Sequence, residues 1–153
     1  MLDPSFNKKI RKIIHKLEYK MYVVILDKKM ACTCRDVNDT PNPDCPKCLG
    51  TGHRVKVKRI TGVMEPDEVS LRLEGQQQAA PSNYYYFDAD KVPKEAVAAG
   101  NIIVREDEAD ILQGAKKYRS DSNRVIYYYT EAVPMKSNIK LFLKNFYNLV
   151  RVK

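Results

Sequence analysis

The chain has 153 residues, of which 44% are hydrophobic and 30% are charged, and its formal net charge is +8. This length supports one buried core, alone or with a small appended module, and the composition is that of a soluble globular protein. The positive charge favours an acidic partner, either a nucleic acid or an acidic protein surface. Because no apolar run is long enough to span a membrane and no signal-peptide pattern opens the chain, we expect synthesis inside the cell and no membrane partner.

The N-terminal segment predicts an amphipathic helix. Asp3 or Ser5 can cap it, and Pro4 suits a first turn. Apolar residues recur at helical spacing: Phe6, Ile10, Ile13, Ile14, Leu17 and Met21. The opposite face carries Asn7 and basic residues: Lys8, Lys9, Arg11, Lys12, Lys16 and Lys20. Such a helix can lie on a membrane or a nucleic acid, but the commoner arrangement buries its apolar stripe against the same protein or a neighbouring subunit. Residues 22–26 then predict a short strand.

The stretch from Cys32 to Cys48 holds all four cysteines. Cys32 and Cys34 form a Cys-x-Cys pair, and Cys45 and Cys48 form a Cys-Pro-Lys-Cys pair that Leu-Gly-Thr-Gly follows. Two close pairs of thiolates supply the four soft ligands of a tetrahedral Zn²⁺ ion, each at about 2.3 Å. These four cysteines are therefore the predicted ligands of a structural zinc site.

The residues around the cysteines favour this prediction. Gly50 and Gly52 can adopt positive φ, so that their N–H groups point back towards the sulfur atoms. Three prolines stiffen a connection that has few apolar residues: Pro41, Pro43 and Pro46. Basic residues flank the loop and would offset the two net negative charges of a four-thiolate zinc centre: Lys28, Lys29, Arg35, Lys47 and Arg54.

Other interpretations of the cysteines remain open. Two disulfides are possible, although nothing indicates an oxidising compartment and a Cys-x-Cys pair cannot easily bridge itself. A redox dithiol at Cys45 and Cys48 normally follows a strand and precedes a long helix, whereas here a proline-rich loop precedes the pair and glycines follow it. His53 could replace one cysteine as a ligand, but we favour a solvated histidine beside the site because four thiolates already fill the coordination shell. A catalytic zinc is disfavoured because four cysteines leave no open coordination position.

Beyond the cysteine loop the sequence predicts β structure. Five or six short strands with turns between them indicate a small antiparallel barrel or sandwich. The C-terminal segment fits a strand through Ile139, Leu141 and Leu143, but we favour a helix on the spacing of Ile139, Phe142, Leu143, Phe146 and Val150. The predicted strands cover residues 54–60, 69–73, 84–87, 101–105, 117–119 and 124–130, with a loop over 74–83, a turn-helix over 90–100 and a turn over 120–123.

The expected fold class is therefore α+β and mainly β: a small antiparallel β-barrel or sandwich with an N-terminal amphipathic helix and an inserted zinc knuckle. The expected organisation is a helix and a strand over residues 1–30, a zinc-binding loop over residues 31–54, and a small β-barrel-like domain with a C-terminal helix or strand over residues 55–153.

Tyrosine triplets at residues 84–86 and 127–129 are the second unusual feature. Aromatic rings between basic residues could stack nucleic-acid bases. Successive residues of a strand face opposite sides, however, so at most two tyrosines of each triplet share a face, and we favour roles in the core and at a protein–protein interface. The two histidines, His15 and His53, join no recognisable catalytic arrangement, so we expect no enzyme activity and no small-molecule substrate.

The run from Cys45 to Gly52 resembles one half of the zinc-binding repeat of DnaJ-type chaperones, Cys-x-x-Cys-x-Gly-x-Gly, although the chain lacks the His-Pro-Asp signature of their J domain. A wider pattern resembles a group of tailed-bacteriophage virion proteins. It comprises an N-terminal helix, a strand, a Cys-x-Cys…Cys-Pro-x-Cys-x-Gly-Thr-Gly loop and a small β-barrel with an Ile-Ile-Val strand. In this chain the pattern runs from Phe6 to Val133, and it departs at Asn101 and after Pro134.

This resemblance implies a structural protein of the neck, the head–tail connector, the tail or the baseplate, located in the virion and assembled as a homo-oligomeric ring beside other virion proteins, with DNA nearby. Our leading hypothesis is thus a non-enzymatic neck or connector protein stabilised by one structural Zn²⁺. The alternative is a zinc-containing nucleic-acid-binding module, which the net charge and the strands that combine aromatic and basic residues support. Such a module should combine basic residues with the tyrosines on one face, whereas we expect the basic N-terminal segment to lie away from them.

Overall fold

Strands dominate the structure, a computed structural model that describes residues 9, 12–14, 16–66, 83–119, 123–135 and 138–152. The strands are β1 (Tyr19–Ala31), β2 (His53–Pro66), β3 (Asn83–Asp88), β4 (Ile102–Arg105), β5 (Glu108–Arg119) and β6 (Val125–Pro134). A short 3₁₀ helix, η1 (Lys94–Val97), precedes β4, and an α-helix, α3 (Ile139–Val152), follows β6. The expectation of a mainly β, antiparallel protein is confirmed.

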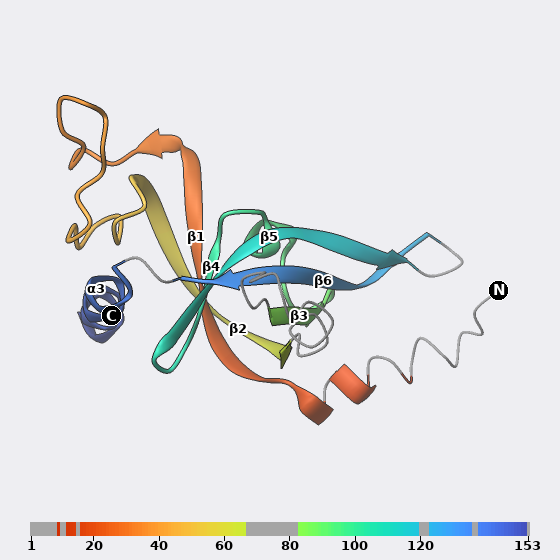
Figure 1. Ribbon diagram of the computed structural model, residues 1–153. Coiled ribbons are helices and arrows are strands. Elements are labelled where there is room, and N and C mark those ends of the chain that lie inside the picture. Colours follow the sequence, from red (N-terminus) through yellow and green to blue (C-terminus); the bar gives the residue numbers. More distant parts are fainter. Residues whose placement is uncertain are drawn as a thin grey trace, which may run out of the picture.

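The strands pair antiparallel and close on themselves in the order β1-β2-β3-β6-β5-β4, so that β4 also pairs with β1 (Figure 1). β1 closes this barrel because it pairs with β2 on one edge and with β4 on the other. Val23, for example, lies opposite Lys58 of β2 and Ile103 of β4. The pairing on both edges satisfies the backbone polar groups that an edge strand would leave open.

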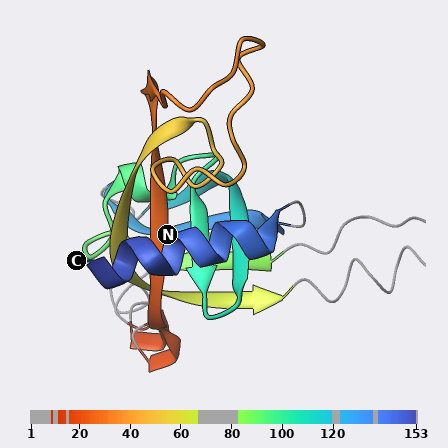
Figure 2. The ribbon, with the colours of Figure 1, turned by 90° about the vertical axis from the view of Figure 1, so that its left-hand side faces the viewer.

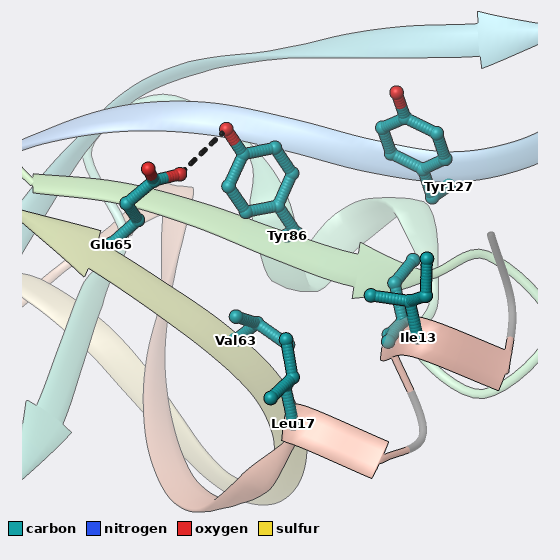
Figure 3. A pocket seen from close by; sticks show the side chains of 7 residues that line it. Ile13, Leu17, Val63, Glu65, Tyr86 and Tyr127 are labelled. Atoms are coloured by element: carbon teal, nitrogen blue, oxygen red, sulfur yellow. Dashed lines mark hydrogen bonds between the residues drawn. The ribbon is translucent and has the colours of Figure 1, made fainter.

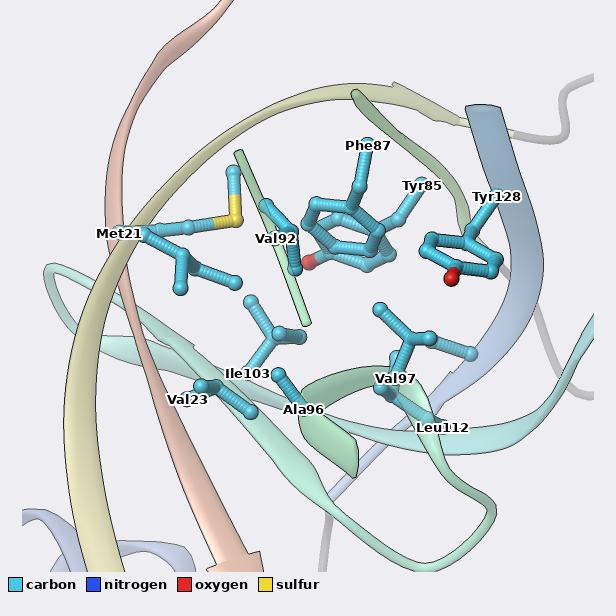
Figure 4. Packing of buried hydrophobic residues seen from close by; sticks show 12 residues of the cluster. Met21, Val23, Tyr85, Phe87, Val92, Ala96, Val97, Ile103, Leu112 and Tyr128 are labelled. Carbon is cyan, nitrogen blue, oxygen red and sulfur yellow. The ribbon is translucent and has the colours of Figure 1, made fainter. Parts of the chain in front are cut away.

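One apolar core fills the interior of the closed sheet (Figure 4). Met21 and Val23 enter it from β1, and Tyr85 and Phe87 enter it from β3 with stacked rings whose centroids are 6.0 Å apart. η1 contributes Ala96. The other buried members of this interior core are Ile60, Val92, Val97, Ile103, Leu112, Tyr128 and Ala132.

A second apolar core lies outside the sheet, beneath α3, which runs across the strands in Figure 2. Phe142 and Phe146 point from the helix into this core, and the ring of Phe146 meets that of Tyr22 edge-on at 5.4 Å. Val24 is fully buried here, one residue along from Val23 in the interior. The helical prediction for the C-terminal segment is confirmed. Among the described residues, no helix has the length and apolar character that crossing a bilayer requires.

The predicted N-terminal helix is not confirmed as a whole. Residues 12–14 and 16–17 are helical, and the N–H of Glu18 donates to the carbonyl of Ile14 at 2.8 Å. Most of the segment before Lys12 lies outside the described residues, as do the predicted strand at 69–73 and the loop up to residue 82.

The prediction that Met21 belongs to the helical stripe is wrong. β1 begins at Tyr19, and Met21 is a strand residue, 2% exposed and opposite Ile60 of β2. Met21 lies at helical spacing from Leu17, but it also begins the two-residue alternation that continues through Val23. Pairing with β2 and burial in the interior favour the strand. Neither the pairing nor the burial can be read from the spacing of neighbouring residues.

The other predicted strands that fall within the described residues are confirmed with different ends, and β5 is much longer than predicted. It begins at Glu108, whereas the sequence indicated a strand only from residue 117. The missed stretch contains Asp110, which is buried, and Gly114. Both residues break the apolar alternation.

Asn101, at which the chain departs from the virion-protein pattern, is 1% exposed and joins η1 to β1. Its Nδ2 donates to the carbonyls of Glu95 at 2.8 Å and Ala96 at 3.1 Å, while the N–H of Leu26 donates to its Oδ1 at 3.0 Å. The amide therefore satisfies backbone groups that the end of η1 and the end of the β1–β4 pairing would otherwise leave unpaired.

Candidate metal centre

The loop between β1 and β2 carries the four cysteines and projects from one end of the closed sheet (Figure 1). Its two ends are held together, because Ala31 pairs with His53 and the N–H of Cys32 donates to the carbonyl of Gly52 at 2.9 Å. The two paired strands therefore deliver Cys32 to the residues that follow Cys48, although the loop itself contains no strand.

All four predicted ligands come together. The ligand sulfur atoms of Cys32, Cys34, Cys45 and Cys48 lie within 4.8 Å of one another, with Sγ–Sγ distances of 3.8 Å between Cys32 and Cys45 and 3.5 Å between Cys34 and Cys48. A disulfide requires about 2.05 Å, and all four cysteines are free. Cys48 is fully buried, and Cys32 and Cys45 are less than a tenth exposed. The arrangement is a compact group of four sulfur donors that is compatible with a metal ion.

The two glycines after Cys48 adopt the predicted conformation. Gly50 has φ +83° and Gly52 has φ +80°, and the backbone N–H groups of both donate to the sulfur of Cys48. Burial raises the pKa of the Cys48 thiol to about 12, against the opposing effect of these donors. The backbone therefore turns back on the sulfur and offers it hydrogen bonds that would stabilise a thiolate.

Cys45 shows the opposite balance. Burial acts to raise its pKa, but the N–H groups of Cys48 and Lys47 donate to its sulfur and outweigh burial, so the pKa falls to about 7. The N–H of Asn42 donates to the sulfur of Cys34 in the same way. Backbone donors thus reach three of the four sulfur atoms, as is usual for the surroundings of metal-bound thiolates.

The side chain of Arg35 links distant parts of the cysteine loop through backbone carbonyls. Its Nε and Nη2 donate to the carbonyl of Gly52 at 3.0 and 2.7 Å, and its Nη1 donates to the carbonyl of Asp39 at 3.1 Å. One guanidinium therefore holds the start of the loop against its end. The sequence indicated Arg35 only as a flanking charge, because its partners are backbone carbonyls that composition cannot identify.

The loop also packs against the body of the protein. Leu49, with φ +57°, is 3% exposed and belongs to the outer core together with Phe142 of α3. Nδ2 of Asn145 on α3 donates to Oδ1 of Asp44 at 2.9 Å. Residues flanking the second cysteine pair therefore fix the loop to the C-terminal helix.

His53, the alternative ligand, is not a member of the sulfur group. It opens β2, and its Nδ1 is buried without a hydrogen-bond partner among the described residues. Four cysteines already supply a full tetrahedral set, so a role for His53 in the group is not needed.

A second polar cluster, which the sequence did not predict, lies between β3, β4 and β5. The carboxylate of Asp110 accepts hydrogen bonds from the Tyr85 hydroxyl, from Nδ2 of Asn83 at 3.0 Å and from Nη2 of Arg105 at 3.2 Å. Burial, and then the Asp110 carboxylate, raise the pKa of Tyr85, so this tyrosine stays protonated. The carboxylate is well paired, which indicates a structural network rather than a reactive group.

The tyrosine triplets alternate across the sheet as predicted. Tyr85 and Tyr128 are buried in the interior core. Their neighbours lie half-buried on the outer face of β3 and β6: Tyr84, Tyr86, Tyr127 and Tyr129.

In comparisons with known proteins, no protein family matches the chain and no curated protein shows significant similarity to it. The resemblance to the DnaJ-type repeat and to tailed-phage virion proteins therefore depends on the motif and layout of the sequence, and the assignment of a function depends on the site.

Replacing Gly52 with alanine should loosen the cysteine loop. A Cβ atom at this position would lie 2.7 Å from Nη2 of Arg35 and 3.1 Å from Cβ of Pro41, and alanine disfavours φ +80°. We expect a cost of about 1–2 kcal/mol, which is a factor of roughly 5 to 30 in the opening equilibrium of the loop. The rate at which the cysteines react with a chromogenic disulfide reagent should rise by that factor. Asn38→Ala, an exposed change in the same loop, should leave the rate unchanged, and equal rates for both variants would contradict the role of Gly52.

Proposed function

We propose that this chain is a non-enzymatic structural protein whose cysteine loop binds one Zn²⁺ ion, and that it forms a ring in the neck or head–tail connector of a tailed-phage virion. The observation that carries the proposal is the closed group of four cysteine sulfurs, held between paired strands and packed against α3. The resemblance stated for the sequence supplies the virion context and the neighbouring virion proteins as partners.

Zinc suits a set of four thiolate donors, whereas magnesium and calcium do not. Four sulfurs at about 2.3 Å from a tetrahedral ion lie about 3.8 Å from one another. The Sγ–Sγ distances of 3.8 Å and 3.5 Å are close to this value, and all four sulfurs lie within 4.8 Å of one another. Soft thiolates disfavour magnesium and calcium, which prefer oxygen ligands.

A structural role follows from the number and surroundings of the ligands. Catalytic zinc sites keep one open position for water or substrate, whereas four cysteines occupy every position of a tetrahedral ion. The sulfurs are mostly buried, and backbone N–H groups donate to several of them. An ion here would clamp the end of the β1–β2 hairpin and, through Leu49 and Asp44, the C-terminal helix.

Exposed apolar side chains support assembly. Ile13 and Leu17 in the N-terminal segment are 57% and 58% exposed, and Tyr19 at the start of β1 is 40% exposed. Ile14, which lies between Ile13 and Leu17 in the sequence, is only 5% exposed. One side of the segment therefore packs against the protein, while Ile13 and Leu17 face outward. Exposed apolar groups that gather in one place usually mark an interface.

The metal prediction concerns composition and stability together. The purified protein should contain one zinc per chain, and Cys48→Ser should abolish binding and unfold residues 31–54. Zinc binding contributes about 10–16 kcal/mol in small zinc-finger peptides, but the closed sheet has its own core and should survive in weakened form. Elemental analysis and thermal unfolding followed by circular dichroism measure both effects, with Thr33→Ser as the control. Iron in place of zinc, or two disulfides in the mass spectrum, would contradict the proposal.

The assembly prediction concerns the outward residues of the N-terminal segment. The wild-type chain should form a closed oligomer in light scattering coupled to gel filtration. The double variant Ile13→Ser, Leu17→Ser should be monomeric with an unchanged unfolding temperature, because these side chains are largely exposed in the single chain.

The matched control is Lys12→Ser with Lys16→Ser, which removes exposed side chains from the same segment and should leave the oligomer intact. Removal of residues 1–17 should also give a monomer, but with a lower unfolding temperature because the buried Ile14 is lost. The deletion stops before β1 and before the 2.8 Å ion pair of Glu18 with Lys91. A monomeric wild-type chain, or an oligomer that survives in the serine variant, would contradict assembly through this segment.

A further inference from the structure

An apolar cavity of about 280 Å³ lies between the N-terminal helical residues and the outer face of the sheet (Figure 3). Its volume is slightly below the roughly 300 Å³ at which pockets for small molecules begin, so it suits one ring system rather than an extended ligand. Its lining is apolar or aromatic except for one carboxylate: Ile13, Ile14, Leu17, Val63, Glu65, Tyr86 and Tyr127.

The cavity opens onto a continuous aromatic surface. The ring of Tyr127 stacks on that of Tyr118 with centroids 4.8 Å apart and an interplanar angle of 13°, and the ring of Tyr86 stacks on that of Tyr129 at 6.3 Å. Nζ of Lys116 lies 5.9 Å from the ring centroid of Tyr129. Aromatic rings with a cation beside them form the kind of surface on which successive unpaired bases stack.

Basic residues accompany this surface. Lys9, Lys12 and Lys16 are exposed and belong to the same N-terminal segment as the lining residues Ile13 and Leu17. The sequence-based expectation that this basic segment lies away from the tyrosines is therefore wrong. A second copy of the chain would bring the same positive charge to the surface, since the net charge is +8, whereas a polyanion is complementary to it.

The single carboxylate in the lining, that of Glu65, favours a ligand that carries a hydrogen-bond donor. The hydroxyl of Tyr86 donates to Oε2 of Glu65 at 3.4 Å. A carboxylate has about four lone-pair sites, so Glu65 retains capacity to accept hydrogen bonds from a ligand. Adenine and cytosine carry an exocyclic amino group that can donate to it, and thymine carries none.

We propose that this cavity receives one unpaired base of a single-stranded nucleic acid, which inserts between the tyrosines and the N-terminal segment while the flanking bases stack on the outer tyrosines. Tyr86 and Tyr127 hold the base by ring contact, Glu65 accepts from its amino group, and the lysines contact the phosphates. The inference does not use the cysteine loop. The cavity shares Ile13 and Leu17 with the segment proposed for assembly, so the tests below follow nucleic-acid binding and oligomeric state in the same variants.

The first test is fluorescence anisotropy with labelled ten-nucleotide strands of deoxyadenosine, deoxycytidine and thymidine and with a ten-base-pair duplex. The full-length protein should bind the adenine and cytosine strands more tightly than the thymine strand, and the duplex most weakly, because pairing hides the amino groups and ring faces. Affinity for single strands should fall steeply with salt, since the lysines release counterions.

Variants separate the base site from general charge attraction. Tyr127→Leu should weaken single-strand binding by about fivefold to a hundredfold, the range measured for loss of one stacked base. Tyr19→Leu, which removes an exposed tyrosine outside the cavity, should change binding little. Glu65→Gln should narrow the preference for adenine and cytosine over thymine without lowering overall affinity, because glutamine both donates and accepts. Unfolding temperatures identify any variant that is merely unstable, and Tyr86→Leu then replaces Tyr127→Leu.

Several results would overturn the inference. Equal affinity for duplex and single strands, no detectable binding at low salt, or equal effects of Tyr127→Leu and Tyr19→Leu would each exclude a base-binding cavity. A change in oligomeric state in Tyr127→Leu, with nucleic-acid binding unaltered, would instead identify the aromatic surface as a contact between copies of the chain.

Discussion

The fold depends above all on the burial of β1 on both of its faces. Val23 points into the interior core and Val24 into the outer core beneath α3, and both are fully buried. Burying a valine contributes about 1.5–3 kcal/mol, and adjacent residues can both gain it only if structure covers both sides of the strand. The closed sheet covers one side and the C-terminal helix covers the other. Loss of the interior core or of the C-terminal helix would expose one face of β1, the strand that pairs with both β2 and β4.

The cysteine loop extends this arrangement rather than standing apart from it. β1 leads directly to Cys32, and β2 leaves from Gly52, so the spacing of the sulfurs depends on the pairing of the two strands. Leu49 joins the same outer core that covers Val24. A metal ion at the sulfurs would therefore stabilise the strand pair, the loop and the docking of α3 together, and would compensate for the few apolar residues of the loop.

Local chemistry in the sequence predicted part of this structure. The convergence of the four cysteines, the positive φ of Gly50 and Gly52, the C-terminal helix and the alternation of the tyrosines all follow from residue type and spacing over a few positions. Features that depend on distant pairing could not be predicted in this way. Met21 fits both the helical and the strand periodicity, and it is a strand residue because it pairs with Ile60 of β2. The sequence did not indicate the start of β5 because Asp110 interrupts its apolar alternation. This aspartate can be buried in a strand only because Tyr85 of β3 and Arg105 of β4 bond to its carboxylate. The cavity between the N-terminal segment and Tyr127 is likewise lined by residues that are far apart in the sequence.

The central claim is that four cysteines alone surround a structural metal ion in the loop between β1 and β2. X-ray absorption at the zinc edge of the purified protein tests it most directly, because the method reports the number and kind of atoms bound to the ion. The account predicts four sulfur neighbours at about 2.3 Å with no nitrogen or oxygen ligand. A shell of three sulfurs with one nitrogen or oxygen would contradict it, since that shell would bring in His53 or water and leave one cysteine outside the site.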